Sequence, residues 1–318
     1  MEMNLAPFYG TIFDLVIFAF VATPSIAILI AIWLNRRFVK KQPLGVRGAL
    51  QIWSRVALDS VMVMGICGTT IGMQGMVANL DLDTTTTENL YSTVRIALLT
   101  FIWAGLLAGL GLAIRDKQSQ VDFKLSIAGL TFVLFCLFYL IFDQIDQTGV
   151  PPKIFFTEPF TWTIYGGIFV ACFLTALACG KSKSLLIIAI ESNLAATLGG
   201  AGIGMCYWFL EGGNYLESRD AIFITANIIT IGCISYLLLY FLSLYCDKRE
   251  LGDFQIKTWH FTEAASFFIF LIYAPVSSTE YFRESIDQAG IQAQHEAQEI
   301  RIELLEAQIR ILTANQKS

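Results

Sequence analysis

The fold of this chain is decided by a stretch that occurs twice. Residues 59–73 read DSVMVMGICGTTIGM, and residues 191–205 read ESNLAATLGGAGIGM. Aligned without a gap, the two copies share an acid followed by Ser, then one Gly, then Ile-Gly-Met at equal offsets. Both are apolar enough to lie in a bilayer. A segment repeated with equal internal spacing indicates a duplicated structural unit.

The composition assigns the chain to the membrane proteins. Of its 318 residues, 55% are hydrophobic and 15% are charged, whereas soluble domains carry roughly 25% charged residues. The apolar residues come in blocks of about 20, the length that crosses a bilayer as a helix. We therefore expect an all-α, polytopic bundle surrounded by membrane lipid. The basic residues form no patch, so no nucleic-acid partner is expected.

Eight membrane spans are predicted from these blocks. They cover residues 11–34, 57–78, 91–114, 123–143, 160–180, 187–210, 219–245 and 258–278. Lys and Arg gather in the loops after the first, third, fifth and seventh spans, and the intervening loops are acidic. Because cytoplasmic loops carry the excess of basic residues, both termini are expected outside. The prediction is a multi-pass protein of the bacterial inner membrane with periplasmic termini.

The repeat divides the membrane part into two units, residues 1–150 and 151–279. Each unit holds four spans, an even number, so the two units are expected to insert in the same orientation as parallel repeats. Residues 97–100 (ALLT) match residues 227–230 (NIIT), which makes Thr230 the expected counterpart of Thr100. Residues 17–18 and 168–169, both Ile-Phe, give a looser match between the first and fifth spans.

The last segment, residues 280–318, is polar, rich in Glu, Gln and Ala, and free of Pro. Its apolar and small residues recur every 3.5 positions, the period of a coiled coil. We expect a C-terminal coiled-coil helix that packs on copies of itself or on a partner. The alternative is a surface helix that folds back on its own chain or lies at the lipid interface.

No motif of enzyme chemistry is present in the sequence. The seven cysteines make no Cys-x-x-Cys pair, and the two histidines lie far apart. The Gly-Thr-Thr-Ile-Gly run lacks the Gly-Lys-Ser/Thr ending of a phosphate loop. The expectation is a protein that is not an enzyme and that has no metal and no cofactor.

What remains are polar groups at membrane depth, which are costly there and are functional candidates by default. The candidates for an ion path are Thr69, Thr70, Thr100, Thr230, Asp59 and Glu191. The two acids are the better choices among those near span ends because they occupy equivalent places in the repeat. The alternative is that Asp59 pairs with Arg55 four residues earlier, and that the threonines bond their own helix carbonyls.

Glycines at a spacing of four form a second group of candidates. Such small-x-x-x-small motifs let two membrane helices approach closely. The predicted helix-packing residues are Gly68, Gly72, Gly105, Gly109, Gly200 and Gly204.

Two consecutive spans of the first unit carry a resemblance. Residues 65–73 (GICGTTIGM), an acidic loop, and residues 96–109 (IALLTFIWAGLLAG) resemble the MotA/TolQ/ExbB family. Proteins of that family have a Leu-Gly-x-x-Gly-Thr-x-x-Gly-Met helix, a short outer loop and an Ala-Leu-x-Thr-Thr-x-x-Gly-Leu helix. The resemblance is good over these two spans and weaker in the second unit.

The resemblance implies a ring of identical subunits around single-span helices of a partner of the ExbD/TolR/MotB kind. That partner carries a membrane Asp, and proton or sodium flow drives rotation or pulling. Thr69 and Thr100 match family threonines that face the central pore. The chain departs from the family because Ala201 and Gly202 replace the Thr pair in its second unit. It also lacks the family's large cytoplasmic portion, and it adds a fourth span to each unit and a tail.

The leading hypothesis is therefore an oligomeric subunit of an ion-driven membrane motor or energy transducer, with the proton as the ion that the resemblance implies. Its second and third spans would line a central path around the partner helix. One alternative is a secondary transporter with parallel repeats and a site between the units near Asp59 and Glu191. A second alternative is a structural membrane scaffold that acts through its coiled-coil tail.

Overall fold

A computed structural model describes most of the membrane part of the chain. It covers residues 14–39, 41, 44–80, 87–114, 125–156, 159–179, 185–210 and 215–246, with the single positions 262, 265, 266 and 269. Every regular element in these residues is helical. The elements are α2 (Leu15–Leu34), the π-helical segment η1 (Asn35–Val39), α3 (Val46–Leu80), α4 (Thr87–Ile114), α5 (Ile127–Asp146), α6 (Pro152–Phe156), α7 (Pro159–Ala178), α8 (Leu185–Leu210) and α9 (Tyr215–Cys246).

Seven of these helices are long and apolar enough to cross a membrane. They correspond to the first seven predicted spans, so the prediction of an all-helical, multi-pass membrane protein is confirmed. The eighth predicted span, residues 258–278, contributes four described positions. The predicted coiled coil at residues 280–318 lies outside the described residues.

Local chemistry sets two helix starts and one end. The Asp14 side chain accepts hydrogen bonds from the first backbone N–H groups of α2 and also pairs with Arg95 of α4. Ser126 caps α5 in the same way. Such caps satisfy N–H groups that have no partner inside the helix. After α5 the chain turns at Gly149, whose φ of 70° suits a residue without a side chain.

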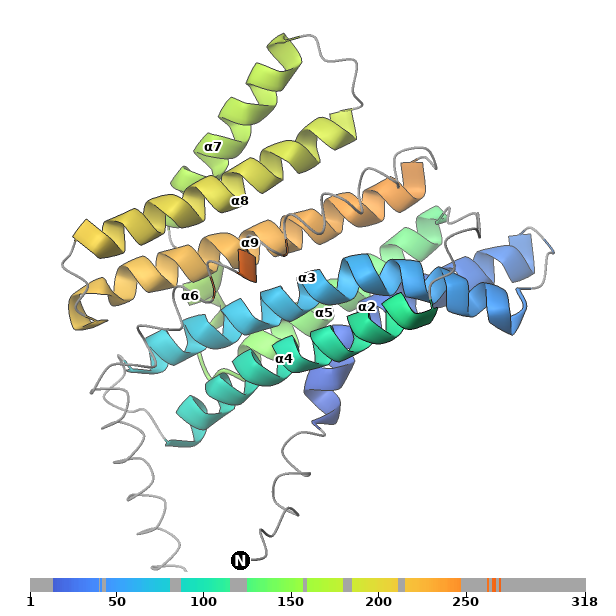
Figure 1. Ribbon diagram of the computed structural model, residues 1–318, viewed down its shortest axis with the longest axis horizontal. Helices are drawn as coiled ribbons and strands as arrows, with labels where there is room; N and C mark the ends of the chain where they lie inside the picture. The colour runs from blue at the N-terminus through green and yellow to red at the C-terminus, as the bar shows by residue number, and fades with distance from the viewer. Residues whose placement is uncertain are drawn as a thin grey trace, which may run out of the picture.

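Four helices form the centre of the molecule. α8, α9, α3 and α4 lie side by side in that order (Figure 1), and each neighbouring pair is in extensive contact. α2 packs on α3, α4 and α5, whereas α7 packs on α8 and α9. α3 is the most enclosed of the seven spans and α7 the least. The main contact between the first and second units is therefore that of α3 with α9, and α5 adds a smaller contact with α9.

The main core runs through this junction. Its largest fully buried side chains include Phe20 of α2 and Tyr236, Tyr240 and Phe241 of α9. A smaller core joins α7, α8 and α9 around Tyr165, Ala196 and Ile228. The shared core holds the two units together and fixes the polar side chains between them.

Candidate functional site

One face of α3 is made of glycines that press against α4. A Cβ built on Gly68 would lie 2.5 Å from the Thr100 Cγ2, and one on Gly72 would lie 2.6 Å from the Ala97 backbone nitrogen. A Cβ on Gly65 would overlap the Ala104 side chain. Contacts this short exclude any larger residue, so these glycines set the distance between the two helices.

The same contact recurs between α8 and α9. Gly200 meets Ile228 at 3.0 Å from its ideal Cβ, Gly204 meets Thr225, and Thr197 sits against Gly232. On α3 and α8 the contact positions follow identical steps of three and four residues, and so do those on α4 and α9. In the third contact the glycine changes helix. In the first unit Gly65 of α3 faces Ala104 of α4, whereas in the second unit Thr197 of α8 faces Gly232 of α9.

These contacts correct the alignment of the second unit. Thr100 occupies the place of Ile228, two residues before its predicted counterpart Thr230. Two residues turn a helix by about 200°, so Thr230 points away from α8. The first and fifth spans also align differently, since Phe20 meets Gly68 as Ile164 meets Gly200.

The predicted packing glycines of α4 behave differently from the others. Gly105 and Gly109 have no heavy atom within 4 Å of an ideal Cβ. Both are exposed on the outer face of α4, away from α3. Within the single chain they contact no helix.

Thr69 and Thr100 face one another across the α3–α4 contact. Their hydroxyl oxygens are 3.3 Å apart, and Thr69 also donates to the carbonyl oxygens of Gly65 and Ala97 at 2.8 and 3.1 Å. The two side chains are 6% and 0% exposed. That they face a shared passage stays a prediction; within the single chain they are enclosed between α3 and α4.

Thr70 points to the other side of α3 and meets α9. The Thr230 hydroxyl donates to the Thr70 hydroxyl at 2.7 Å, and the Gln74 amide nitrogen donates to the Thr230 hydroxyl at 3.1 Å. Asn227 lies one turn before Thr230 on α9 and is 1% exposed. We call Thr70, Gln74, Asn227 and Thr230 the polar seam. It joins the two units at the α3–α9 junction.

The polar seam contains unmet hydrogen-bonding capacity. The Gln74 Oε1 atom and both side-chain polar atoms of Asn227 are buried without a hydrogen-bond partner. On α5, the buried Gln144 also has two such atoms. A buried amide without a partner costs about 1–3 kcal/mol, so the seam is a place where the chain retains an unfavourable arrangement.

The two predicted acids occupy different surroundings. Asp59 is 3% exposed, and its carboxyl is hydrogen-bonded to the Tyr240 hydroxyl of α9. It thus lies on the same α3–α9 junction as the polar seam, eleven residues before Thr70, or roughly 16 Å along the helix at about 1.5 Å per residue. Glu191 is half-buried on α8. The two equivalent acids of the repeat therefore differ in burial: Asp59 is enclosed at the α3–α9 junction, and Glu191 is half-buried on α8.

Sequence reasoning missed several polar residues of this junction. Gln74 and Tyr240 lie in apolar spans and belong to no motif, and Asn227 opens the matched stretch 227–230, of which only Thr230 was taken as a candidate. Their signal was available in the spacing, because Asp59, Thr70 and Gln74 share one side of a helix whose opposite side carries the glycines.

A second polar group lies within the other unit. The Tyr165 hydroxyl donates to the Asn193 Oδ1 atom, and the Asn193 amide nitrogen donates to the Gly232 carbonyl oxygen at 3.1 Å. These bonds tie α7, α8 and α9 together, and both side chains have partners.

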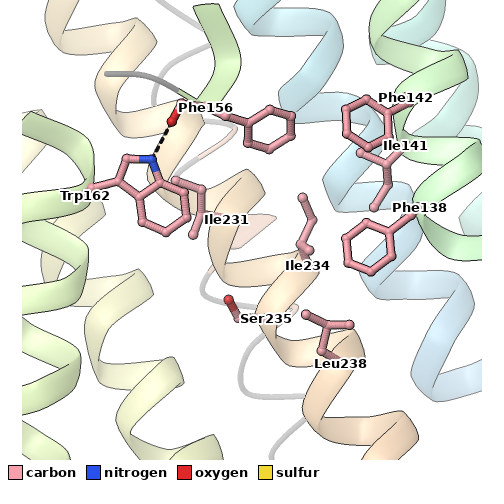
Figure 2. Close-up of a pocket in the computed structure, with 9 residues that line it drawn as sticks. All are labelled: Phe138, Ile141, Phe142, Phe156, Trp162, Ile231, Ile234, Ser235 and Leu238. Carbon is pink, nitrogen blue, oxygen red and sulfur yellow. Dashed lines mark hydrogen bonds between the residues drawn. The ribbon is translucent and has the colours of Figure 1, made fainter. Parts of the chain in front are cut away.

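A cavity of about 320 Å³ opens between α5, α6, α7 and α9. Figure 2 shows its lining of aromatic and aliphatic side chains, with the Trp162 indole nitrogen donating to the Phe156 carbonyl oxygen at 2.6 Å. Ser235 supplies a side-chain hydroxyl to the lining. The lining suits apolar chains and offers little to an ion.

Comparisons with known proteins do not assign this chain to a family. No protein-family model, curated protein or solved structure matches this chain. Within the part of the chain that the structure describes, no three His, Cys, Asp or Glu side chains come together as metal ligands. The arguments about function therefore rest on the α3–α4 contact and the polar seam.

Proposed function

We propose that this chain is an oligomeric subunit of an ion-driven membrane motor or energy transducer, and that the polar seam handles the coupled ion. The observation that carries the proposal is the Gln74 Oε1 atom, which is buried without a partner on a side chain bonded to the Thr70–Thr230 hydroxyl pair, together with the two unpartnered polar atoms of Asn227 one turn before Thr230. Hydroxyl and amide groups can bond water or a passing cation without adding a charge to the membrane interior.

The α3–α4 contact supports the same proposal. The residues that resemble the MotA/TolQ/ExbB family are those that bring these two helices together, among them Gly68, Gly72, Ala97 and Thr100. In our proposal this helix pair is the structural frame of each unit. The proposal also includes a single-span partner helix that carries a membrane Asp, coupling to protons or sodium ions, and a location in the inner membrane.

A secondary transporter with parallel repeats is the second candidate. It is favoured by the position of the polar seam and Asp59, which lie between the two units, where transporters built from repeats bind their substrates. The two candidates differ in one measurable property. A transporter moves its ion as a lone chain, whereas a motor subunit needs its ring and partner.

Ion flux in liposomes tests the proposal. The complex, purified from native membranes in mild detergent, is reconstituted with a pH-sensitive or a sodium-sensitive dye inside, and a potassium diffusion potential is imposed. We expect flux of one of the two ions, reduced at least tenfold in Thr70→Val combined with Thr230→Val. Thr131→Val is the matched control, because Thr131 is exposed on α5 and donates to the carbonyl oxygen of Ile127 in its own helix.

Elution volume and thermal stability check that each variant is folded. Absence of both proton and sodium flux from the wild-type complex would overturn the proposal. So would undiminished flux in the folded double variant. Flux from a wild-type chain freed of any single-span protein would favour the transporter.

A further inference from the structure

The duplication relates two outer helix faces of the molecule to the internal contact between α3 and α9. α3 corresponds to α8, and α4 corresponds to α9, through the three matching contacts between the helices of each unit. Within the chain, α3 of the first unit also contacts α9 of the second. The equivalent contact for the remaining two helices is α8 of one chain with α4 of another.

The face of α9 that meets α3 has an exposed counterpart on α4. Through the correspondence, Thr230 maps to Ile102, Cys233 to Gly105 and Leu237 to Gly109. The three α9 side chains are buried. Ile102 is 46% exposed, and Gly105 and Gly109 have open space beside them.

The face of α3 that meets α9 likewise has a counterpart on α8. Thr70 maps to Gly202, Cys67 to Gly199 and Ile71 to Ile203. All three α3 residues are buried, and Cys67 neighbours Cys233 of α9. On α8, Ile203 is 46% exposed and an ideal Cβ on Gly202 meets nothing within 4 Å, whereas an ideal Cβ on Gly199 lies 3.5 Å from the side chain of Ile168 on α7.

The two free faces also lie where a further chain could join. In Figure 1 the four central helices run α8, α9, α3, α4, with α7 packed on the far side of α8. The glycines with open space beside them are Gly105 and Gly109 on α4 and Gly202 on α8, whereas Gly199 contacts α7. Small residues on both sides allow helix backbones to approach closely in a membrane.

We propose that α8 of a second copy of this chain docks on α4, through a contact equivalent to the internal α3–α9 contact. The interface is head-to-tail, so each chain offers α4 to one neighbour and α8 to the other. Contacts of this kind produce a closed ring when the rotation between copies closes. The inference rests on the duplicated geometry and holds whichever ion the complex uses.

Cysteine cross-linking tests this interface directly. Ile102 and Gly202 are the counterparts of Thr230 and Thr70, whose hydroxyls touch. Ile102→Cys with Gly202→Cys, in a chain whose exposed native cysteines are replaced by Ser, is oxidised in native membranes. The native cysteines to be replaced are Cys179, Cys206 and Cys246.

A head-to-tail interface predicts a ladder of cross-linked species on a non-reducing gel. Either cysteine alone should give no cross-link. Phe135→Cys with Gly202→Cys is the control, because Phe135 is 70% exposed on α5, outside the proposed interface. Absence of the ladder overturns the proposal, as it would if a partner helix occupied α4 in place of a second copy. Cross-linking of Ile102→Cys with itself also overturns it.

A second pair of variants tests the interface without oxidation. Gly105→Leu with Gly109→Leu should convert the particle to single chains, because neither position has a neighbour inside the chain. Gly167→Leu is the matched control, since Gly167 is exposed on α7 and also has nothing within 4 Å. Mass photometry of nanodisc-embedded protein gives the answer, and wild-type mass in the double variant contradicts the interface.

Discussion

Two adjacent threonines on α3 serve opposite neighbours. Consecutive residues of a helix are about 100° apart, so Thr69 reaches α4 while Thr70 reaches α9. The first is saturated by carbonyl oxygens and by Thr100. The Thr70 hydroxyl also bonds carbonyl oxygens of its own helix, those of Ile66 and Cys67, but it lies in a seam that contains unpartnered amide atoms. The Thr-Thr pair therefore combines a helix-packing role with a polar role in successive residues.

Removing the hydroxyls of Thr69 and Thr100 should have a small effect. Valine keeps the shape of threonine, and hydrogen bonds between membrane helices average about 0.6 kcal/mol. We expect Thr69→Val with Thr100→Val to lower the unfolding free energy by about 1 kcal/mol and to leave ion flux within twofold of wild type. Thermal unfolding in detergent and the liposome assay measure the two quantities. Loss of flux in a folded double variant would indicate that the ion path runs along the α3–α4 contact and not along the polar seam.

Asn227 should show the opposite balance between stability and activity. Replacing a buried, unpartnered amide by an apolar side chain of similar size removes its desolvation cost. We expect Asn227→Leu to raise the unfolding free energy by about 1 kcal/mol while lowering ion flux. Asn227→Leu with unchanged flux would show that the amide has no part in the path. Thr163→Val is the control for loss of a polar group away from the seam, because Thr163 is exposed on α7 and donates to the Pro159 carbonyl oxygen of its own helix. It should leave ion flux unchanged.

At the scale of elements, the two helix pairs are two solutions of one packing problem. The first unit places Gly65 against Ala104, and the second places Thr197 against Gly232. In each pair a small residue on one helix accommodates a larger residue on the other. The reversal explains how the units keep one geometry with different sequences.

This reversal can be exchanged by mutation. Gly232→Ala alone should lower the unfolding free energy by about 1–3 kcal/mol, because the added methyl group overlaps Thr197. Thr197→Gly added to it recreates the pairing of the first unit and should restore part of the loss. A double-mutant cycle measures the coupling. Strictly additive effects would show that the two positions do not touch.

The seven spans could be predicted because length and hydropathy decide them, and the repeat could be seen in Gly68, Gly72, Gly200 and Gly204. Register within the second unit could not, because residues 97–100 and 227–230 match in letters while their contacts differ by two positions. The side to which Thr69 turns depends on its neighbour Thr100, and a single sequence carries no information on that contact. Gln74 was overlooked because it stands alone in an apolar segment, and Asn227 because the match of residues 97–100 with 227–230 drew attention to Thr230.

At the scale of the whole molecule, one geometrical relation recurs. Each unit consists of a glycine-faced helix and its partner, and the units join through α3 and α9. The outer two of the four central helices, α8 and α4, are the counterparts of that junction. The tail at residues 280–318 stays a prediction, as does the scaffold role that was tied to it.

Assembly and ion movement should be linked if the complex is a motor. Gly105→Leu with Gly109→Leu leaves the polar seam untouched, since both glycines are on the outer face of α4. We expect this variant to lose ion flux together with its assembly, while Gly167→Leu retains both. Full flux from single chains would contradict the motor and support the transporter.

The most direct test of the whole account is a three-dimensional map of the particle taken intact from native membranes. We predict a closed ring in which α4 of every chain lies against α8 of the next, with the polar seam inside each chain and partner helices on the axis. A particle made of one chain, or a two-fold pair in which α4 meets α4, would contradict the account.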